Sequence, residues 1–293
     1  MSVKPEDFDA FWRAAVDESR SVPLNFRRTR APAGLKSPMH VETIDFEAMH
    51  GRSLHGWLAF PAGARRLPAF LWLPPYGRES VLPDEYGTRE GFASMSFNFH
   101  GESAFHRESY TKERGYFADG AESPETWIFR RMLQDALIAA RVLQAQLEVD
   151  EDRIGSMGMS QGGGMSIWLG AWSPVVKAVC ADMPFLGNIG STIQGNVYRY
   201  PLRELTDFMA ELPVGPERVK HTVSYYDTVF QASQCHCPTQ VSLGQKDPAA
   251  RPEQVNAIFD SLPGEKRLES YPVGHEWTSE MVDNNREWLR AYL

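Results

Sequence analysis

Ser160 stands at the centre of a Gly-x-Ser-x-Gly sequence, Gly158 to Gly162, between a predicted strand and a predicted helix. Such a pentapeptide arises by chance in about one chain in ten of this size, so its context decides its meaning. A nucleophile elbow turns so sharply from strand to helix that side chains two before and two after the serine would collide, and glycine at both places removes the collision. We therefore predict that Ser160 is a nucleophile. The alternative is a glycine-rich turn with an incidental serine.

A serine hydroxyl needs a base to take its proton. In hydrolases with a nucleophile elbow, the acid and then the histidine follow the serine along the chain. Of the eight histidines, His221, His236 and His275 follow Ser160. His275 falls in a loop between the last predicted strand and the last predicted helix, where the base of such a fold belongs. His236 precedes a strand and His221 falls in a predicted insertion. We predict that His275 is the base.

Asp247 follows a buried-strand pattern directly, in Leu243 to Pro248. From there its carboxylate could accept the imidazole N–H and stabilise the imidazolium that forms during attack. The alternative is a turn aspartate before a proline. Asp227 and Asp260 are lesser candidates for the acid.

The oxyanion of a tetrahedral intermediate needs two backbone N–H groups, one of them from the residue after the nucleophile. Gln161 is that residue. The second donor comes from the loop after an earlier strand, which here ends at Leu73. Because Pro75 has no N–H, Tyr76 is the nearest available donor.

The elements that must position these residues follow from the hydrophobic pattern. Continuous apolar runs at 69–73, 92–99 and 175–180 are typical of strands buried on both faces, hence of a parallel sheet. One apolar face from Phe129 to Leu147 predicts a long helix over that sheet. Strands and helices then alternate again to the C-terminus, which indicates an α/β fold with ligands at the carboxyl ends of the strands.

The remaining segments flank that frame. Phe8, Phe11 and Trp12 mark an amphipathic helix in an N-terminal extension of about residues 1–30. Residues 41–47 and 54–60 predict a hairpin. We expect a single domain over 1–293 with a cap-like insertion at about 185–234, whose aromatic residues would limit the length of the acyl group. These aromatic residues are Tyr198, Tyr200, Phe208, Tyr225 and Tyr226.

Composition narrows the classes of function. The 293 residues carry a net charge of −8 and no basic cluster, which argues against nucleic acid as a partner. No apolar run approaches the roughly 20 residues that span a bilayer, and Met1 to Arg20 lacks the features of a secretory signal, so we expect a cytoplasmic protein without membrane contact. Three cysteines do not form a disulfide framework, and Cys235-His236-Cys237 has no second ligand pair, so we expect neither a metal nor another cofactor.

These motifs resemble the acetyl xylan esterase and cephalosporin C deacetylase family of carbohydrate esterases. The resemblance is densest at 158–164 and extends to 7–12, 126–131, 182–186, 224–227 and the His275-Glu276 pair. It implies an α/β-hydrolase fold, the triad of Ser160, Asp247 and His275, and an oxyanion hole formed by Tyr76 and Gln161. It also implies a preference for small acyl groups, chiefly acetyl on sugars, and assembly as a hexamer.

The chain departs from that family pattern at two places. His100-Gly101-Glu102 stands where the family has Arg-Gly-Gln, and Pro74-Pro75 precedes Tyr76 where the family has His-Gly. The substrate is therefore less firmly implied than the fold. A peptidase or longer-chain esterase on the same frame is one alternative, and a catalytically silent binding module is another.

Overall fold

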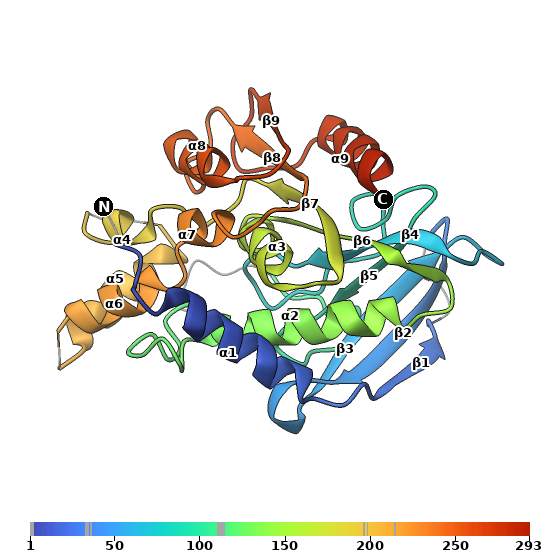
Figure 1. The fold of residues 1–293 in the computed structure, drawn as a ribbon, viewed down its shortest axis with the longest axis horizontal. Coiled ribbons are helices and arrows are strands. Elements are labelled where there is room, and N and C mark those ends of the chain that lie inside the picture. Colours follow the sequence, from blue (N-terminus) through green and yellow to red (C-terminus); the bar gives the residue numbers. More distant parts are fainter. Residues whose placement is uncertain are drawn as a thin grey trace.

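A nine-stranded sheet organises the described part of the chain in the computed structural model, which covers residues 3–32, 35, 37–109, 115–195, 197, 199–213 and 215–293 (Figure 1). The strand order is β1-β2-β3-β5-β4-β6-β7-β8-β9. The strands are β1 (Phe26–Arg30), β2 (His40–Glu47), β3 (Ser53–Phe60), β4 (Leu67–Leu73), β5 (Ala93–Phe97), β6 (Val149–Met159), β7 (Val176–Asp182), β8 (Thr239–Gly244) and β9 (Lys266–Tyr271). The helices are α1 (Phe8–Arg20), α2 (Ile128–Gln144), α3 (Gln161–Trp172), α4 (Ile189–Thr192), α5 (Leu202–Glu211), α6 (Glu217–Ser224), α7 (Thr228–Ala232), α8 (Pro252–Ser261) and α9 (Ser279–Tyr292).

The sheet divides into an antiparallel end and a parallel end. From β5 through β4, β6, β7, β8 and β9 every pairing is parallel, whereas β1, β2, β3 and β5 pair antiparallel. The predicted hairpin is confirmed, with His40 opposite Phe60 and Glu47 opposite Ser53. Because the parallel strands share one direction, their carboxyl ends meet at a single edge, and the segments that follow β4, β6, β8 and β9 carry the predicted site residues.

Strand β4 shows why its sequence is continuously apolar. Leu71 and Leu73 point into the larger core, which α1, α2 and α3 share, while Phe70 and Trp72 point to the opposite face. There they pack in a second cluster with Trp288 and Leu289 of α9. Alternate residues of a strand therefore enter different cores, as a parallel strand covered on both faces requires.

Two details of the predicted elements are wrong. Helix α2 ends at Gln144, and Leu147 is 78% exposed, because the chain leaves the helix to enter β6 and no longer follows the helical period. The sequence of β1 gave no strand signal, because Phe26–Arg30 is a mostly basic, mostly exposed edge strand. It belongs to the sheet through its pairing with β2, although it falls in the region expected to be a helical extension.

The segment 185–234 contains α4 to α7, and part of it belongs to the core. Tyr226 is fully buried, and its ring packs against those of Trp12, Trp127 and Trp168. Tyr225 is also buried and donates to Asp7 at 2.6 Å. The expectation that these two tyrosines limit acyl length is therefore wrong, because both join the insertion to α1 and the core. Tyr198 lies outside the described residues.

None of the described helices has the length and the apolar character that crossing a bilayer demands.

Candidate active site

Ser160 occupies a strained turn between β6 and α3. Its φ of 59° and ψ of −118° lie outside the regions that residues with a Cβ ordinarily adopt. A Cβ on Gly158 would lie 2.6 Å from the carbonyl carbon of Gly162, and one on Gly162 would overlap the carbonyl oxygen of Leu73. The predicted collision is thus confirmed, and the two glycines permit the turn. Its ends are fixed by Ser160 N–H donating to Asp182 O at 2.9 Å and Phe185 N–H donating to Ser160 O at 3.0 Å.

The predicted acid and base are joined by a hydrogen bond. His275 Nδ1 lies 2.6 Å from Asp247 Oδ2, and the Asp247 side chain is fully buried. Asp247 Oδ1 accepts from the backbone N–H of Ala249 at 2.7 Å and of Ala250 at 3.0 Å. These two bonds fix the carboxylate from behind, so its other oxygen faces the imidazole. Backbone bonds from Lys246 N–H to Val273 O and from Gln245 N–H to Tyr271 O hold the two loops together.

Ser160 lies at the same edge of the sheet as this pair, since β6, β8 and β9 end there. Within the described residues its Oγ makes no hydrogen bond to His275. Bonds between nucleophile and base are often long before substrate binds, and tighten in the reacting complex.

The alternative acids and bases have other surroundings. Asp227 caps α7 and accepts N–H groups from Val229, Asn188 and Ile189, which is a structural role. Asp260 is an exposed residue of α8. The two histidines that follow Ser160 but precede His275, namely His221 and His236, are also exposed.

Across the part of the chain that the structure describes, no group of three or more His, Cys, Asp or Glu residues could hold a metal ion. Cys235 and Cys237 approach each other with 3.5 Å between their sulfur atoms. Burial raises the pKa of Cys180, so this thiol behaves as a packing group.

Tyr116, a residue that the sequence did not indicate, links the loop that carries Tyr76 to the side chain of Gln161. The Tyr116 hydroxyl donates to Gln161 Oε1 at 3.1 Å and accepts the N–H of Gly77 at 3.1 Å. Gln161 is the first residue of α3, so its own N–H is among those that a helix leaves without an internal acceptor. Burial raises the pKa of Tyr116 well above its usual value, so the bridging group is a neutral hydroxyl. The bridge connects the β4 loop with the elbow.

Glu204 of α5 is a second residue that sequence reasoning missed. Its side chain is fully buried, and it accepts hydrogen bonds from the Tyr76 hydroxyl and from Phe117 N–H, the latter at 2.8 Å. The sequence of α5 has the spacing of an amphipathic helix, in which Glu204 stands beside Arg203 and resembles an ordinary surface carboxylate. A glycine directly before the aromatic pair Tyr116-Phe117 is the signal that could have pointed to close packing here.

His100, where the chain departs from the family pattern, packs against Tyr116. Its ring centre is 4.2 Å from that of Tyr116, and its buried Nε2 has no hydrogen-bond partner among the residues that the structure describes. Burial, reinforced by the positive charges of Arg78 and Arg131, lowers the pKa of His100 to about 3. The imidazole is therefore neutral near pH 7.

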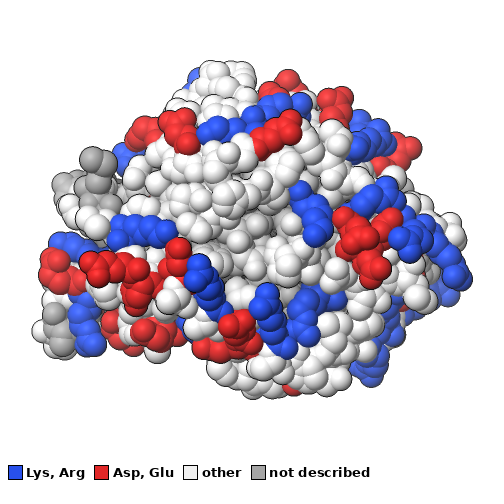
Figure 2. Space-filling model, viewed as in Figure 1, with Lys and Arg blue, Asp and Glu red and all other residues white. Residues whose placement is uncertain are grey.

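A cavity of about 520 Å³ adjoins the predicted site. Its walls include Phe185, whose N–H bonds to Ser160 O, and Pro248 and Ala249, which follow Asp247. Tyr200 and Leu202 of the segment 185–234 also line it. Figure 2 shows that acidic and basic side chains alternate around the rim of one face, while its hollowed centre carries uncharged residues.

The sheet topology and the serine at the sharp turn between β6 and α3 are those of a hydrolase of the α/β type. Two solved structures are similar over almost their whole length. An acetyl xylan esterase from Paenibacillus sp. R4 matches with a TM-score of 0.87 and 24% identity, covering 100% of this chain and 96% of that one. Acetyl xylan esterase 1 from Thermoanaerobacterium sp. JW/SL YS485 matches with a TM-score of 0.83 and 24% identity, covering 99% and 94%. These likenesses show the α/β-hydrolase fold.

The model of the acetyl xylan esterase family matches residues 1–292, and the chain belongs to that family. A curated relative, the acetyl esterase Axe7A of Xylanibacter ruminicola, is 23% identical over 302 residues, which cover 99% of this chain and 67% of that protein. The protein is accordingly a carboxylic ester hydrolase of the serine type. The predicted fold class and family resemblance are both confirmed.

Proposed function

We propose that this protein removes acetyl groups from carbohydrate esters through a triad of Ser160, His275 and Asp247. The observation that carries the proposal is the 2.6 Å bond between His275 Nδ1 and Asp247 Oδ2, formed by loops at the edge of the sheet where Ser160 stands. With its Nδ1–H donated to the carboxylate, the imidazole keeps Nε2 as a proton acceptor. Family membership supports acetyl as the acyl group.

The reaction begins when Ser160 Oγ attacks the acyl carbonyl carbon while His275 Nε2 accepts the hydroxyl proton. Asp247 stabilises the resulting imidazolium, and the backbone N–H groups of Tyr76 and Gln161 hold the oxyanion. Collapse of the intermediate expels the sugar alcohol, which takes its proton from His275. Water then attacks the acyl-enzyme with His275 as base, which releases acetate and restores Ser160.

The cavity beside the site supports a leaving group of sugar size. At about 520 Å³ it falls in the range of small-molecule sites, which is roughly 300 to 1,000 Å³. Its lining residues carry hydroxyl groups (Ser191, Thr192, Tyr200), apolar side chains (Phe185, Leu202) and the guanidinium groups of Arg199 and Arg251. Such a mixture suits a sugar ring, which has both hydroxyl groups and apolar faces.

The test is turnover on a panel of acetylated sugars, matched octanoyl esters and peptide amides, together with labelling by a fluorophosphonate. We expect stoichiometric labelling that Ser160→Ala abolishes, and a kcat/KM for acetyl esters well above that for the other two classes. Preference for octanoyl esters or amides would favour the alternative hydrolases. A folded protein that is neither labelled nor active would favour the silent binding module.

A further inference from the structure

Glu204 is a buried carboxylate that the proposed mechanism does not use. It lies on α5 of the insertion, 128 residues after Tyr76 in the sequence, and its side chain is shielded from solvent. Oε1 accepts from the Tyr76 hydroxyl and Oε2 accepts from Phe117 N–H. Burying a carboxylate is unfavourable unless such donors satisfy it, so stability alone gives little reason to place one here.

The surroundings of this contact leave little freedom of movement. A Cβ on Gly115 would overlap the Tyr76 hydroxyl and would come within 3.4 Å of Glu204 Oε1, so glycine permits the approach. The Tyr76 ring also packs against Tyr116 and Phe117, with ring centres 4.8 and 6.0 Å apart. Two segments distant from Tyr76 in the sequence, residues 115–117 and α5, therefore hold its side chain in one place.

We propose that Glu204 is a positioning residue for the oxyanion hole. This inference rests on the proposed function, because Tyr76 matters there through its backbone N–H. Glu204 holds the phenol ring from α5, and the ring fixes the backbone of the loop after β4 where the oxyanion develops. Only a carboxylate offers an acceptor oxygen to each of the two donors. A glutamine has one acceptor oxygen, so with that oxygen on Phe117 N–H its NH₂ group would face the Tyr76 hydroxyl, which would lose its carboxylate acceptor.

The experiment measures kcat and KM on an acetyl ester for the wild type, Glu204→Gln, Tyr76→Phe and the double variant. Active sites are counted by fluorophosphonate titration, so that misfolded protein does not lower kcat. We expect each single variant to lower kcat about 10- to 100-fold with little change in KM, because only transition-state binding is lost. The kcat of the double variant should be no lower than that of the less active single variant, since removing the Tyr76 hydroxyl leaves Glu204 Oε1 without that donor and glutamine removes the charge.

A second readout separates positioning from stability. A trifluoromethyl ketone forms a tetrahedral oxyanion on the serine, so its inhibition constant should rise by the same factor as kcat falls. Glu217→Gln is the matched control, because it neutralises an exposed carboxylate of the same insertion, paired with Lys220 at 2.7 Å, and should retain wild-type kcat.

Wild-type kcat per active site in both single variants would overturn the proposal, as would effects that multiply in the double variant. If Glu204→Gln does not fold, Tyr76→Phe decides: a lower kcat in the folded protein supports the proposal, and an unchanged kcat overturns it. Failure of the proposed function has a different signature, since the wild type itself would then be neither labelled nor active.

Discussion

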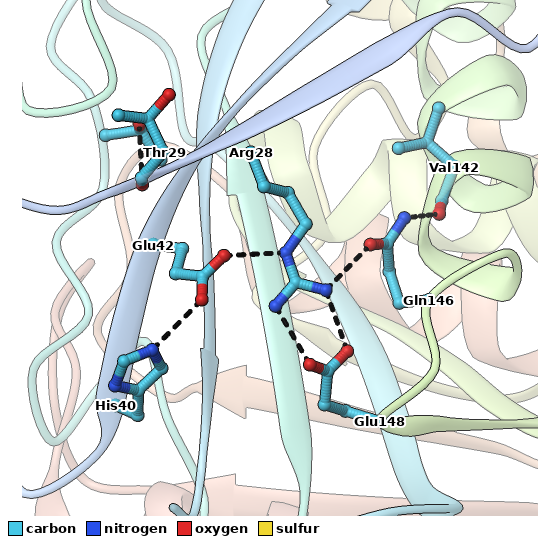
Figure 3. Close-up of polar contacts among 8 residues, drawn as sticks. Arg28, Thr29, His40, Glu42, Val142, Gln146 and Glu148 are labelled. Atoms are coloured by element: carbon cyan, nitrogen blue, oxygen red, sulfur yellow. Dashed lines mark hydrogen bonds and ion pairs between the residues drawn. The ribbon is translucent and has the colours of Figure 1, made fainter.

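Two polar networks occupy different regions of the sheet and differ in what they hold together. At the antiparallel end, Arg28 of β1 lies between Glu42 of β2 and the loop that joins α2 to β6 (Figure 3). It donates to Glu42 at 2.8 Å, to both oxygens of Glu148 at 2.8 and 2.9 Å, and to Gln146 at 3.2 Å. At the carboxyl edge of the parallel strands, the site network instead joins loops through His275, Asp247, Tyr116 and Glu204.

The difference lies in how charge and strain are used. The Arg28 cluster brings opposite charges together, and although burial raises the pKa of Glu148, its bonds to Arg28 outweigh this and lower it. The site network contains a serine in a strained conformation and a buried carboxylate bonded to a phenol. Paired charges such as those of the Arg28 cluster stabilise the fold. Strained backbone and buried carboxylates are unfavourable for stability, and they occur most often where function requires them. Breaking each network should therefore affect a different measured quantity.

The largest expected effect is that of Asp247→Asn on kcat. The amide oxygen can still accept the N–H groups of Ala249 and Ala250, which leaves the NH₂ group facing His275 Nδ1. The imidazole then places its proton on Nε2, where it can no longer accept the proton of Ser160. We expect kcat to fall about 10⁴-fold with a nearly unchanged melting temperature. A loss of less than about tenfold on an acetyl ester would contradict the assignment of the acid.

Arg28→Ala should show the opposite pattern, with lower stability and unchanged kcat. The change removes the Arg28 donor from partly buried Glu148 and Glu42, of which Glu42 keeps its contact with His40. It should cost roughly 1 to 3 kcal/mol in urea unfolding near pH 7. The lowered pKa of each carboxylate means that its contribution is complete above its usual pKa and is lost as the pH falls through the lowered value. The difference between wild type and variant should therefore shrink in acid.

Arg27→Ala is the matched control on the same strand. Arg27 is 79% exposed and pairs with Asp45 at 3.1 Å, and an exposed pair of this kind contributes little to stability. Equal destabilisation by the two variants would show that the Arg28 cluster has no special role.

The sequence predicted those parts of the site that depend on backbone geometry and chain order. Gly158 and Gly162 are needed by the turn itself, and the order of Ser160, Asp247 and His275 follows the order of the strands. Buried strands were recognised because both faces are apolar. These signals are local, so a single sequence carries them.

The parts that sequence reasoning missed depend on contacts between distant segments. Tyr116 and Glu204 each act through one or two atoms, and no periodicity marks such a contact. Tyr226 looked like a cap residue because it is aromatic and lies in the insertion, but it packs against Trp12. Strand β1 is basic and mostly exposed, so only its pairing with β2 reveals it.

A smaller effect is expected from Tyr116→Phe, which removes the bridge between Gly77 N–H and Gln161 Oε1 and keeps the ring. Both donors of the proposed oxyanion hole then gain freedom, and kcat should fall about tenfold at similar KM. Tyr292→Phe removes a hydroxyl at the exposed end of α9 and should leave kcat unchanged. Equal activity of the two variants would show that the bridge does not position the donors.

Near pH 7 the smallest effect is expected from His100, which acts on the pH dependence of stability. Because the pKa of His100 is lowered to about 3 in the folded protein, the unfolded chain binds a proton between about pH 6.5 and 3 that the folded protein does not bind. The free energy of unfolding therefore falls as the pH drops below 6.5, by up to about 1.4 kcal/mol per pH unit from this group.

His100→Asn should make that fall shallower in urea unfolding at pH 7.5, 6 and 5. His236→Asn, which removes an exposed imidazole, controls for the substitution itself. Identical slopes in His100→Asn and wild type would mean that the imidazole next to Tyr116 takes up a proton in the folded protein, and the neutral, buried state described for it would be wrong.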